Sequence, residues 1–287
     1  MCDDDIHQGL IEDPTVSRRT FGLMTVAAAG LTAASAHAAA PVVEKDVEIK
    51  TPDGLADAAL YYPEGKGAWP AVLLWPDVLS LRPVFREMGK RLAASGYVVL
   101  VPNLYYRVKK APVIEGAFNF ASPDDRAKLA PLRTSVTPDG TDRDAVAYLA
   151  FLDAQPQTDR KKKVGTQGYC MGGPLAFRTA GAVPNRVGAV ASFHGGGLFT
   201  DDPTSPHLLL PKTHAEYMVL VADNDDKQDP AAKEKLKAAL DAAKLKSRVE
   251  VYAGAAHGWT VKGSPVYAEA AAEKAWAELL DLYKRAL

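Results

Sequence analysis

The segment at residues 168–172 holds the residue types that most directly suggest covalent chemistry. It reads Gly-Tyr-Cys-Met-Gly, a G-x-nucleophile-x-G motif that follows a predicted strand and precedes a predicted helix. In such a nucleophile elbow the glycines stand where side chains would collide, and the sharp turn strains the nucleophile's backbone. The dipole of the following helix favours a thiolate. The motif therefore predicts that Cys170 is a nucleophile, with a buried, inert cysteine as the alternative.

Two further residues follow in the order that an α/β hydrolase requires: nucleophile, acid, base, each just after a strand. Asp225 follows an expected strand at 217–222, and His257 follows an expected strand at 248–252. His257 is flanked by small residues in a loop and has no apolar surface to pack against. A catalytic role is therefore favoured over that of an ordinary surface histidine. Asp223 and Asp226 compete with Asp225 for the role of the acid, and Asp225 is our choice.

The elements that must position these residues alternate short β-branched runs with helical stretches. This pattern predicts an α/β fold of the α/β-hydrolase type, with a mostly parallel central sheet and helices on both faces, in one domain at 39–287. Expected strands lie at 47–50, 58–62, 71–75, 97–101, 163–167, 187–193, 217–222 and 248–252, the first two as a hairpin. Expected helices lie at 83–95, from 139 or 141 to 154, from the elbow to 180, at 230–243 and at 267–287. Residues 103–138 are expected to form an irregular excursion over the sheet edge.

Residues 1–38 have the pattern of an export signal rather than of a folded element. Arg18 and Arg19 form a twin-arginine pair before an alanine-rich apolar run at 22–36, and Ala-His-Ala at 36–38 is a small-x-small cleavage site. A membrane anchor is disfavoured, because a span needs about 20 strongly apolar residues. We expect a Tat-type signal, recognition by the Tat export machinery, and a periplasmic or secreted protein.

The cysteine count and the charge balance narrow the function classes. Cleavage after Ala38 removes Cys2 and leaves Cys170 as the one cysteine, so an intrachain disulfide is impossible and burial or chemistry must explain the thiol. The 287 residues are 47% hydrophobic and 24% charged with a net charge of −1, which is ordinary globular composition. No strongly basic surface is available for nucleic acid, so a small-molecule partner is expected. Histidines and carboxylates lack short ligand spacing, so we expect neither a metal nor a cofactor.

The elbow, Gly-Tyr-Cys-Met-Gly-Gly at 168–173, resembles the dienelactone hydrolase family, whose members carry cysteine in place of serine there. Three other stretches match: Pro-Asn-Leu-Tyr-Tyr-Arg at 102–107, Ser-Phe-His-Gly-Gly at 192–196, and residues 254–259. The resemblance covers residues 42–287. It implies that Cys170 is the nucleophile, Asp225 the acid and His257 the base of a hydrolase acting on activated esters or lactones.

The same resemblance suggests residues around the triad. Asp77 stands where well-known members have a glutamate that contacts the thiol, and the backbone N–H groups of Val78 and Met171 would form the oxyanion hole. Arg107 matches an arginine that binds the substrate carboxylate, whereas Val261 stands where a second arginine is expected. Three further residues are candidates for lining the substrate site, with packing as the alternative: Tyr105, Trp259 and His194.

These residues predict acyl transfer through a thioester, formed by Cys170 attack on a carbonyl and hydrolysed by water that His257 activates. One alternative is a non-catalytic binding protein on a hydrolase fold, in which Cys170 serves packing or redox sensing. A thiol redox enzyme is disfavoured, because the mature chain would hold no resolving cysteine.

Overall fold

The computed structural model describes residues 41–287, so the expected signal segment and its cleavage site lie outside the described part. Eight strands form one sheet: β1 (Val42–Thr51), β2 (Gly54–Pro63), β3 (Ala71–Trp75), β4 (Val98–Pro102), β5 (Val164–Tyr169), β6 (Val187–Phe193), β7 (Glu216–Ala222) and β8 (Ser247–Tyr252). Their order is β1-β2-β4-β3-β5-β6-β7-β8. β1 and β2 pair antiparallel, as do β2 and β4, and the remaining neighbours are parallel. The prediction of a mostly parallel sheet is confirmed.

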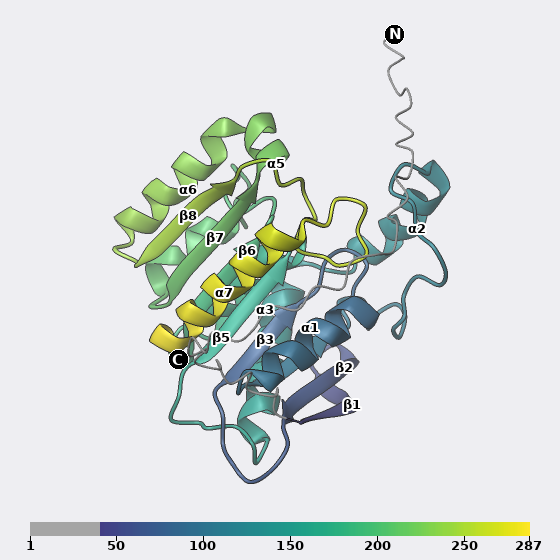
Figure 1. The fold of residues 1–287 in the computed structure, drawn as a ribbon, viewed down its shortest axis with the longest axis vertical. Coiled ribbons are helices and arrows are strands. Elements are labelled where there is room, and N and C mark those ends of the chain that lie inside the picture. The colour runs from purple at the N-terminus through teal and green to yellow at the C-terminus, as the bar shows by residue number, and fades with distance from the viewer. Residues whose placement is uncertain (1–40) are drawn as a thin grey trace, which may run out of the picture. The chain divides into compact units, whose positions relative to one another are not determined.

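The helices are α1 (Pro83–Ala94), α2 (Pro123–Arg133), α3 (Pro138–Ala154), α4 (Gly172–Ala182), α5 (Asp223–Gln228), α6 (Pro230–Ala242) and α7 (Glu269–Ala286), with a 3₁₀ turn at Pro206–Lys212. Buried residues of α1 and α7 pack into one core cluster, and those of α3, α4 and α6 pack into the other. Figure 1 shows α1 and α7 together in front of the sheet. Strands β3, β4 and β5 are buried along their whole length, because helices cover both of their faces.

The expectation of an irregular excursion at 103–138 is wrong for its second half, which contains α2. The side chain of Ser122 accepts a hydrogen bond from the Asp125 N–H, and proline at the first helical position favours the start of a helix. Leu129 and Leu132 bury the inner face of α2. The sequence did contain the capping signal, but Pro131 and the surrounding charges masked the helical pattern.

Smaller differences concern helix ends. α3 begins at Pro138 with Thr137 as its cap, whereas the expected cap was Asp139 or Thr141. The last helix begins at Glu269 rather than at residue 267. The short helix α5 and the 3₁₀ turn were not predicted, because one or two helical turns are too short to show a periodic apolar pattern.

The parallel strands bring the ends of distant segments together. The carboxyl ends of β3, β5, β6, β7 and β8 lie at one edge of the sheet, where ligand sites of open α/β folds form. The turns after these strands begin at Pro76, Cys170, His194, Asp223 and Ala253. Between residues 41 and 287, no helix is both long and apolar enough to cross a membrane.

Candidate active site

The backbone at Cys170 has the geometry of a nucleophile elbow. Its φ is +51°, a left-handed conformation that non-glycine residues rarely adopt. A Cβ on Gly168 would lie 1.9 Å from the Gly172 carbonyl oxygen, and one on Gly172 would lie 2.4 Å from the Trp75 carbonyl oxygen. Both positions therefore require glycine. The contact with Trp75 also presses the elbow directly against the end of β3.

One carboxylate of the three candidates reaches His257. The Nδ1 of His257 lies 2.6 Å from Oδ2 of Asp225, which stands in α5. Asp223 is paired with Lys227 and Asp226 with Lys233, each at 2.6 Å. The three carboxylates thus point in different directions from the short helix, and only Asp225 faces the histidine.

The charge state of His257 follows from its contacts. Burial by itself lowers the pKa of His257, but hydrogen bonds to Asp225 and to the Cys170 thiol outweigh it and raise the pKa to about 10. The raised pKa favours the protonated form of His257 at neutral pH. The side chain of Asn224 accepts a hydrogen bond from the His257 backbone N–H at 2.7 Å and holds the loop in place. No motif in the sequence indicated this role for Asn224.

The two expected oxyanion donors belong to neighbouring turns. The hydroxyl of Tyr105 donates to the Val78 carbonyl oxygen at 2.7 Å and lies 3.8 Å from the Met171 sulfur, so one side chain contacts both residues. Within residues 41–287, neither the Val78 N–H nor the Met171 N–H donates a hydrogen bond to another protein group. Both are therefore available to an oxyanion beside Cys170. Tyr105 itself is fully buried, and it supports this turn rather than lining an open pocket.

Asp77 is already engaged by an arginine. Arg82 binds both carboxylate oxygens, at 2.5 and 2.8 Å, and the Leu79 N–H donates to Oδ1 at 2.9 Å. These contacts hold the turn that carries Val78. Arg82 was not identified from the sequence. The feature that could have indicated its contact with Asp77 is its position five residues further along the chain.

Arg107 is likewise engaged away from the triad. Its guanidinium donates to Asp144 at 2.8 and 2.9 Å and to Asp53 at 2.7 Å, and it stacks over the ring of Tyr106. Its side chain is only 17% exposed. The structure thus places Arg107 in an ion-pair network between the first hairpin and α3.

Another arginine acts electrostatically on Tyr105. Burial and the charge of Asp77 raise the pKa of Tyr105, whereas the charge of Arg133 lowers it. Arg133 ends α2, is exposed, and makes no ion pair with any residue from 41 to 287. Sequence reasoning missed it because it missed α2.

The remaining candidates are buried beside the base. Trp259 is fully buried and stacks on Tyr252, with ring centroids 5.1 Å apart. His194 is 1% exposed and lies 4.8 Å from His257 and 5.1 Å from Trp259 between ring centroids. Both residues are thus buried and do not lie on a surface that a substrate could touch.

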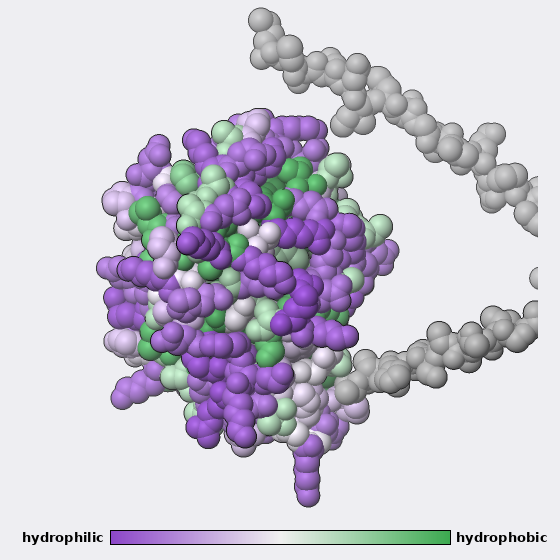
Figure 2. Space-filling view, turned by 90° about the vertical axis from the view of Figure 1, so that its left-hand side faces the viewer, coloured by the Kyte–Doolittle hydropathy of each residue, from purple (hydrophilic) through white to green (hydrophobic). Residues whose placement is uncertain are grey.

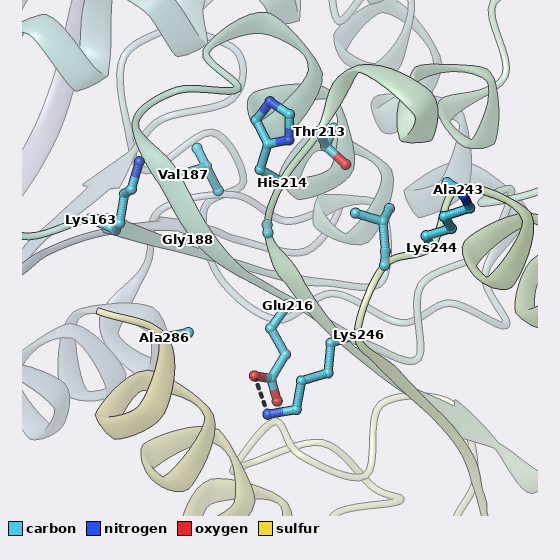
Figure 3. A pocket seen from close by; sticks show the side chains of 12 residues that line it. Lys163, Val187, Gly188, Thr213, His214, Glu216, Ala243, Lys244, Lys246 and Ala286 are labelled. Atoms are coloured by element: carbon cyan, nitrogen blue, oxygen red, sulfur yellow. Dashed lines mark ion pairs between the residues drawn. The ribbon is translucent and has the colours of Figure 1, made fainter.

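One cavity lies far from this site. A cavity of about 500 Å³ lies at the opposite edge of the sheet, where Val187 and Glu216 begin β6 and β7. Figure 3 shows the ion pair of Lys246 with Glu216 at this cavity. On the face drawn in Figure 2, hydrophilic residues dominate and hydrophobic ones form small, separate patches. In the described part of the chain, no three His, Cys, Asp or Glu side chains group as metal ligands would.

Comparison with known proteins identifies the family of the chain. The model of the dienelactone hydrolase family matches residues 56–287. The carboxymethylenebutenolidase of Rhodococcus opacus is 26% identical over 226 residues, covering 77% of this chain and 83% of that protein.

Two solved structures show the same fold. The dienelactone hydrolase of Anabaena variabilis has a TM-score of 0.59 at 20% identity, covering 86% of this chain and 99% of that one. A dienelactone hydrolase-like promiscuous phosphotriesterase from metagenomic libraries has a TM-score of 0.66 at 21% identity, covering 85% and 98%. The chain therefore belongs to the dienelactone hydrolase family and is a carboxylic ester hydrolase on an α/β-hydrolase fold.

Proposed function

We propose that this protein hydrolyses activated esters or lactones through a thioester acyl-enzyme on Cys170. The observation that carries the proposal is the 2.6 Å contact between His257 Nδ1 and Asp225, at a site where the Cys170 thiol also raises the pKa of His257. A nucleophile beside a base that an acid orients is the arrangement that activates a side-chain nucleophile.

In the acylation half-reaction, the Cys170 thiolate attacks the ester carbonyl, and the backbone N–H groups of Val78 and Met171 stabilise the oxyanion. Collapse of this intermediate breaks the ester C–O bond and leaves the acyl group on sulfur. Protonated His257 gives its proton to the leaving alkoxide or enolate. Each oxyanion donor is typically worth about 100- to 1000-fold in rate.

In the deacylation half-reaction, His257 is neutral and takes a proton from a water molecule that attacks the thioester carbonyl. The carboxylic acid leaves, and the thiolate and the imidazolium form again. Asp225 keeps its hydrogen bond to Nδ1 throughout and so fixes the orientation of the ring.

Leaving-group chemistry defines the substrate class. A thiolate is expelled from a tetrahedral intermediate more readily than a plain alkoxide, so attack on an alkyl ester or an amide mostly reverts. Enol esters, lactones with enol leaving groups and aryl esters do not have this problem. We therefore expect activated esters to be turned over faster than plain alkyl esters.

Hydrolysis of p-nitrophenyl acetate by the wild type, Cys170→Ala and Cys170→Ser tests the proposal, with dienelactone as a parallel substrate. Loss of turnover in Cys170→Ala and a mass increase of one acetyl group on the wild-type peptide that holds Cys170 are the expected results. A wild type no faster than Cys170→Ala on both substrates would refute the hydrolytic role of this cysteine.

The rate of alkylation by iodoacetamide against pH provides an independent test. A thiolate paired with protonated His257 reacts at pH values well below the value of about 8.5 that is usual for a free thiol. The variant His257→Gln should move the profile toward the free value. An identical profile in both proteins would contradict the proposed pair and favour a packing or redox-sensing cysteine.

The first 38 residues direct export in this proposal. The twin arginines and the Ala-His-Ala sequence are its basis, and a periplasmic or secreted mature chain is the consequence. Cell fractionation of the full chain beside the double variant Arg18→Lys, Arg19→Lys tests it. An equal distribution of the two proteins between the cytoplasm and the exported fraction would overturn the Tat assignment.

A further inference from the structure

His194 is a buried titratable residue that the proposed chemistry does not use. It occupies the turn directly after β6 with a φ of +42°, and its backbone N–H donates to the Leu220 carbonyl oxygen at 2.8 Å. Its side chain is 1% exposed. A left-handed histidine fixed at this depth needs a structural or functional reason.

The loop that carries the base surrounds this side chain. The His194 ring is tilted by 58° against the His257 ring at 4.8 Å and by 67° against Trp259 at 5.1 Å, both measured between centroids. Its Nε2 lies 2.9 Å from the hydroxyl of Thr260. Residues 257, 259 and 260 thus all contact one imidazole, which connects the loop to the end of β6.

The charges in this cluster are compatible with only one protonated ring. Burial lowers the pKa of His194 well below its usual range, and the charge of His257 lowers it further. The titratable groups that face His257 are therefore a neutral imidazole, the Asp225 carboxylate and the Cys170 thiol. A neutral aromatic ring can lie against the imidazolium of His257, whereas a second cation would repel it.

We propose that His194 is a positioning residue that holds the His257 ring in line between Asp225 and Cys170. Its ring packs against the back of His257, and its hydrogen bond to Thr260 fixes the loop on the other side. The proposal rests on the proposed function of His257 as the base. Because His194 does not reach the surface, it affects turnover through His257 and not through substrate binding.

Three substitutions distinguish the role of the His194 ring from the roles of its hydrogen bond to Thr260 and of its left-handed backbone. His194→Asn tolerates the left-handed backbone but removes the ring, and His194→Phe keeps a ring but removes the bond to Thr260. Thr260→Val removes the hydroxyl and leaves His194 in place. Thermal unfolding followed by circular dichroism shows which variants fold.

The expected result is a kcat loss of about 10- to 100-fold for His194→Asn on p-nitrophenyl acetate, because small misplacements of a catalytic group cost this much. KM should stay within about twofold of the wild type, as for a residue that acts only on the chemical step. His194→Phe should recover most of the loss, and Thr260→Val, which keeps the ring and loses the same bond, should show a similarly small loss. The alkylation profile of Cys170 against pH should shift in His194→Asn and remain close to the wild type in His194→Phe.

Wild-type kcat and an unchanged alkylation profile in folded His194→Asn would overturn the proposal, and so would a raised KM at unchanged kcat. Equal losses in the Phe and Asn variants would also overturn it, since the ring would then have no role. If His194→Asn does not fold, Thr260→Val decides, and wild-type kcat there counts against the proposal. Alkylation reports the pair of His257 and Cys170 without turnover, so failure of ester hydrolysis in the wild type is distinguishable from failure of this inference.

Discussion

Replacement of Arg107 by methionine distinguishes a structural arginine from one that binds substrate. Methionine keeps most of the side-chain length but removes the charge and all the hydrogen bonds. Asp144, which is 6% exposed, would lose two bonds from Arg107, and Asp53 would also lose two. Burial raises the pKa of Asp144 even with its partners present, which shows how poorly this site accommodates an unpaired carboxylate.

The magnitude follows from the burial of the pair. Removal of one partner of a buried ion pair costs about 3–5 kcal/mol in the free energy of unfolding. For a domain of this size, that loss corresponds to a decrease of about 6–20 °C in Tm. Arg143→Met is the matched control, because Arg143 binds the same Asp53 at 2.7 Å but is 46% exposed. Because solvent screens this exposed pair, its loss should lower the free energy of unfolding far less than the loss of Arg107.

Scanning calorimetry or thermal circular dichroism gives Tm, and steady-state kinetics gives KM for dienelactone and for p-nitrophenyl acetate. We expect Arg107→Met to lower Tm far more than Arg143→Met and to leave the ratio of the two KM values unchanged. A Tm within about 2 °C of the wild type, together with a KM raised at least about tenfold for dienelactone alone, would refute this reasoning. Arg107 would then be the carboxylate-binding residue that the family resemblance implies.

Four further predictions concern the site. Asp225→Asn should lower kcat by about 100-fold or more, because the imidazole loses the charge that orients it, while Asp226→Asn should stay near the wild type; equal effects on p-nitrophenyl acetate turnover would remove Asp225 from the triad. Tyr105→Phe should lower kcat by about tenfold with KM unchanged, because the turn of Val78 loses its support, whereas Tyr217→Phe, which removes an equally buried hydroxyl at the other edge, should change stability only. Arg133 is an exposed cation without an ion pair among residues 41–287, so Arg133→Ala should raise KM for the carboxylate-bearing dienelactone and leave KM for p-nitrophenyl acetate unchanged; a parallel change in both would contradict a role of Arg133 in binding the substrate carboxylate. The pKa of His257 is raised from 6.5 to about 10, so its stabilising contribution is complete below pH 6.5 and is lost as the pH rises toward 10; the difference in unfolding free energy between the wild type and His257→Gln, measured in urea, should shrink over this range, and a constant difference would argue against the raised value.

The sequence carried enough information for the elbow and for the edge of the sheet where the site forms. Steric rules at Gly168 and Gly172 are local, and the order of strands and polar loops fixes which turns meet. The residues alone did not decide which of the three acids contacts His257. That choice depends on the direction in which a two-turn helix presents three nearby carboxylates. Lys227 and Lys233 bind two of them, and no local pattern specifies that pairing.

Long-range partners explain the remaining differences. The partners of Arg107 lie 54 and 37 residues away along the chain, so its involvement with Asp53 and Asp144 could not be read from its neighbourhood. The same holds for His194, whose ring contacts a loop 63 to 66 residues further on. A motif identifies which side chains come near a site, whereas packing decides whether they face the substrate or support those that do.

Gly172 closely approaches the end of β3 and so helps to fix the backbone of the elbow. The position of residue 170 therefore does not depend on whether its side chain carries sulfur or oxygen. The backbone fixes where the Cβ of residue 170 stands, because the close contacts that shape the turn are made at Gly168 and Gly172. A serine at this position would inherit the same place without any repacking of the core. The reactivity of the scaffold can therefore change by exchange of one atom, sulfur for oxygen, and with it the range of leaving groups that the enzyme can expel.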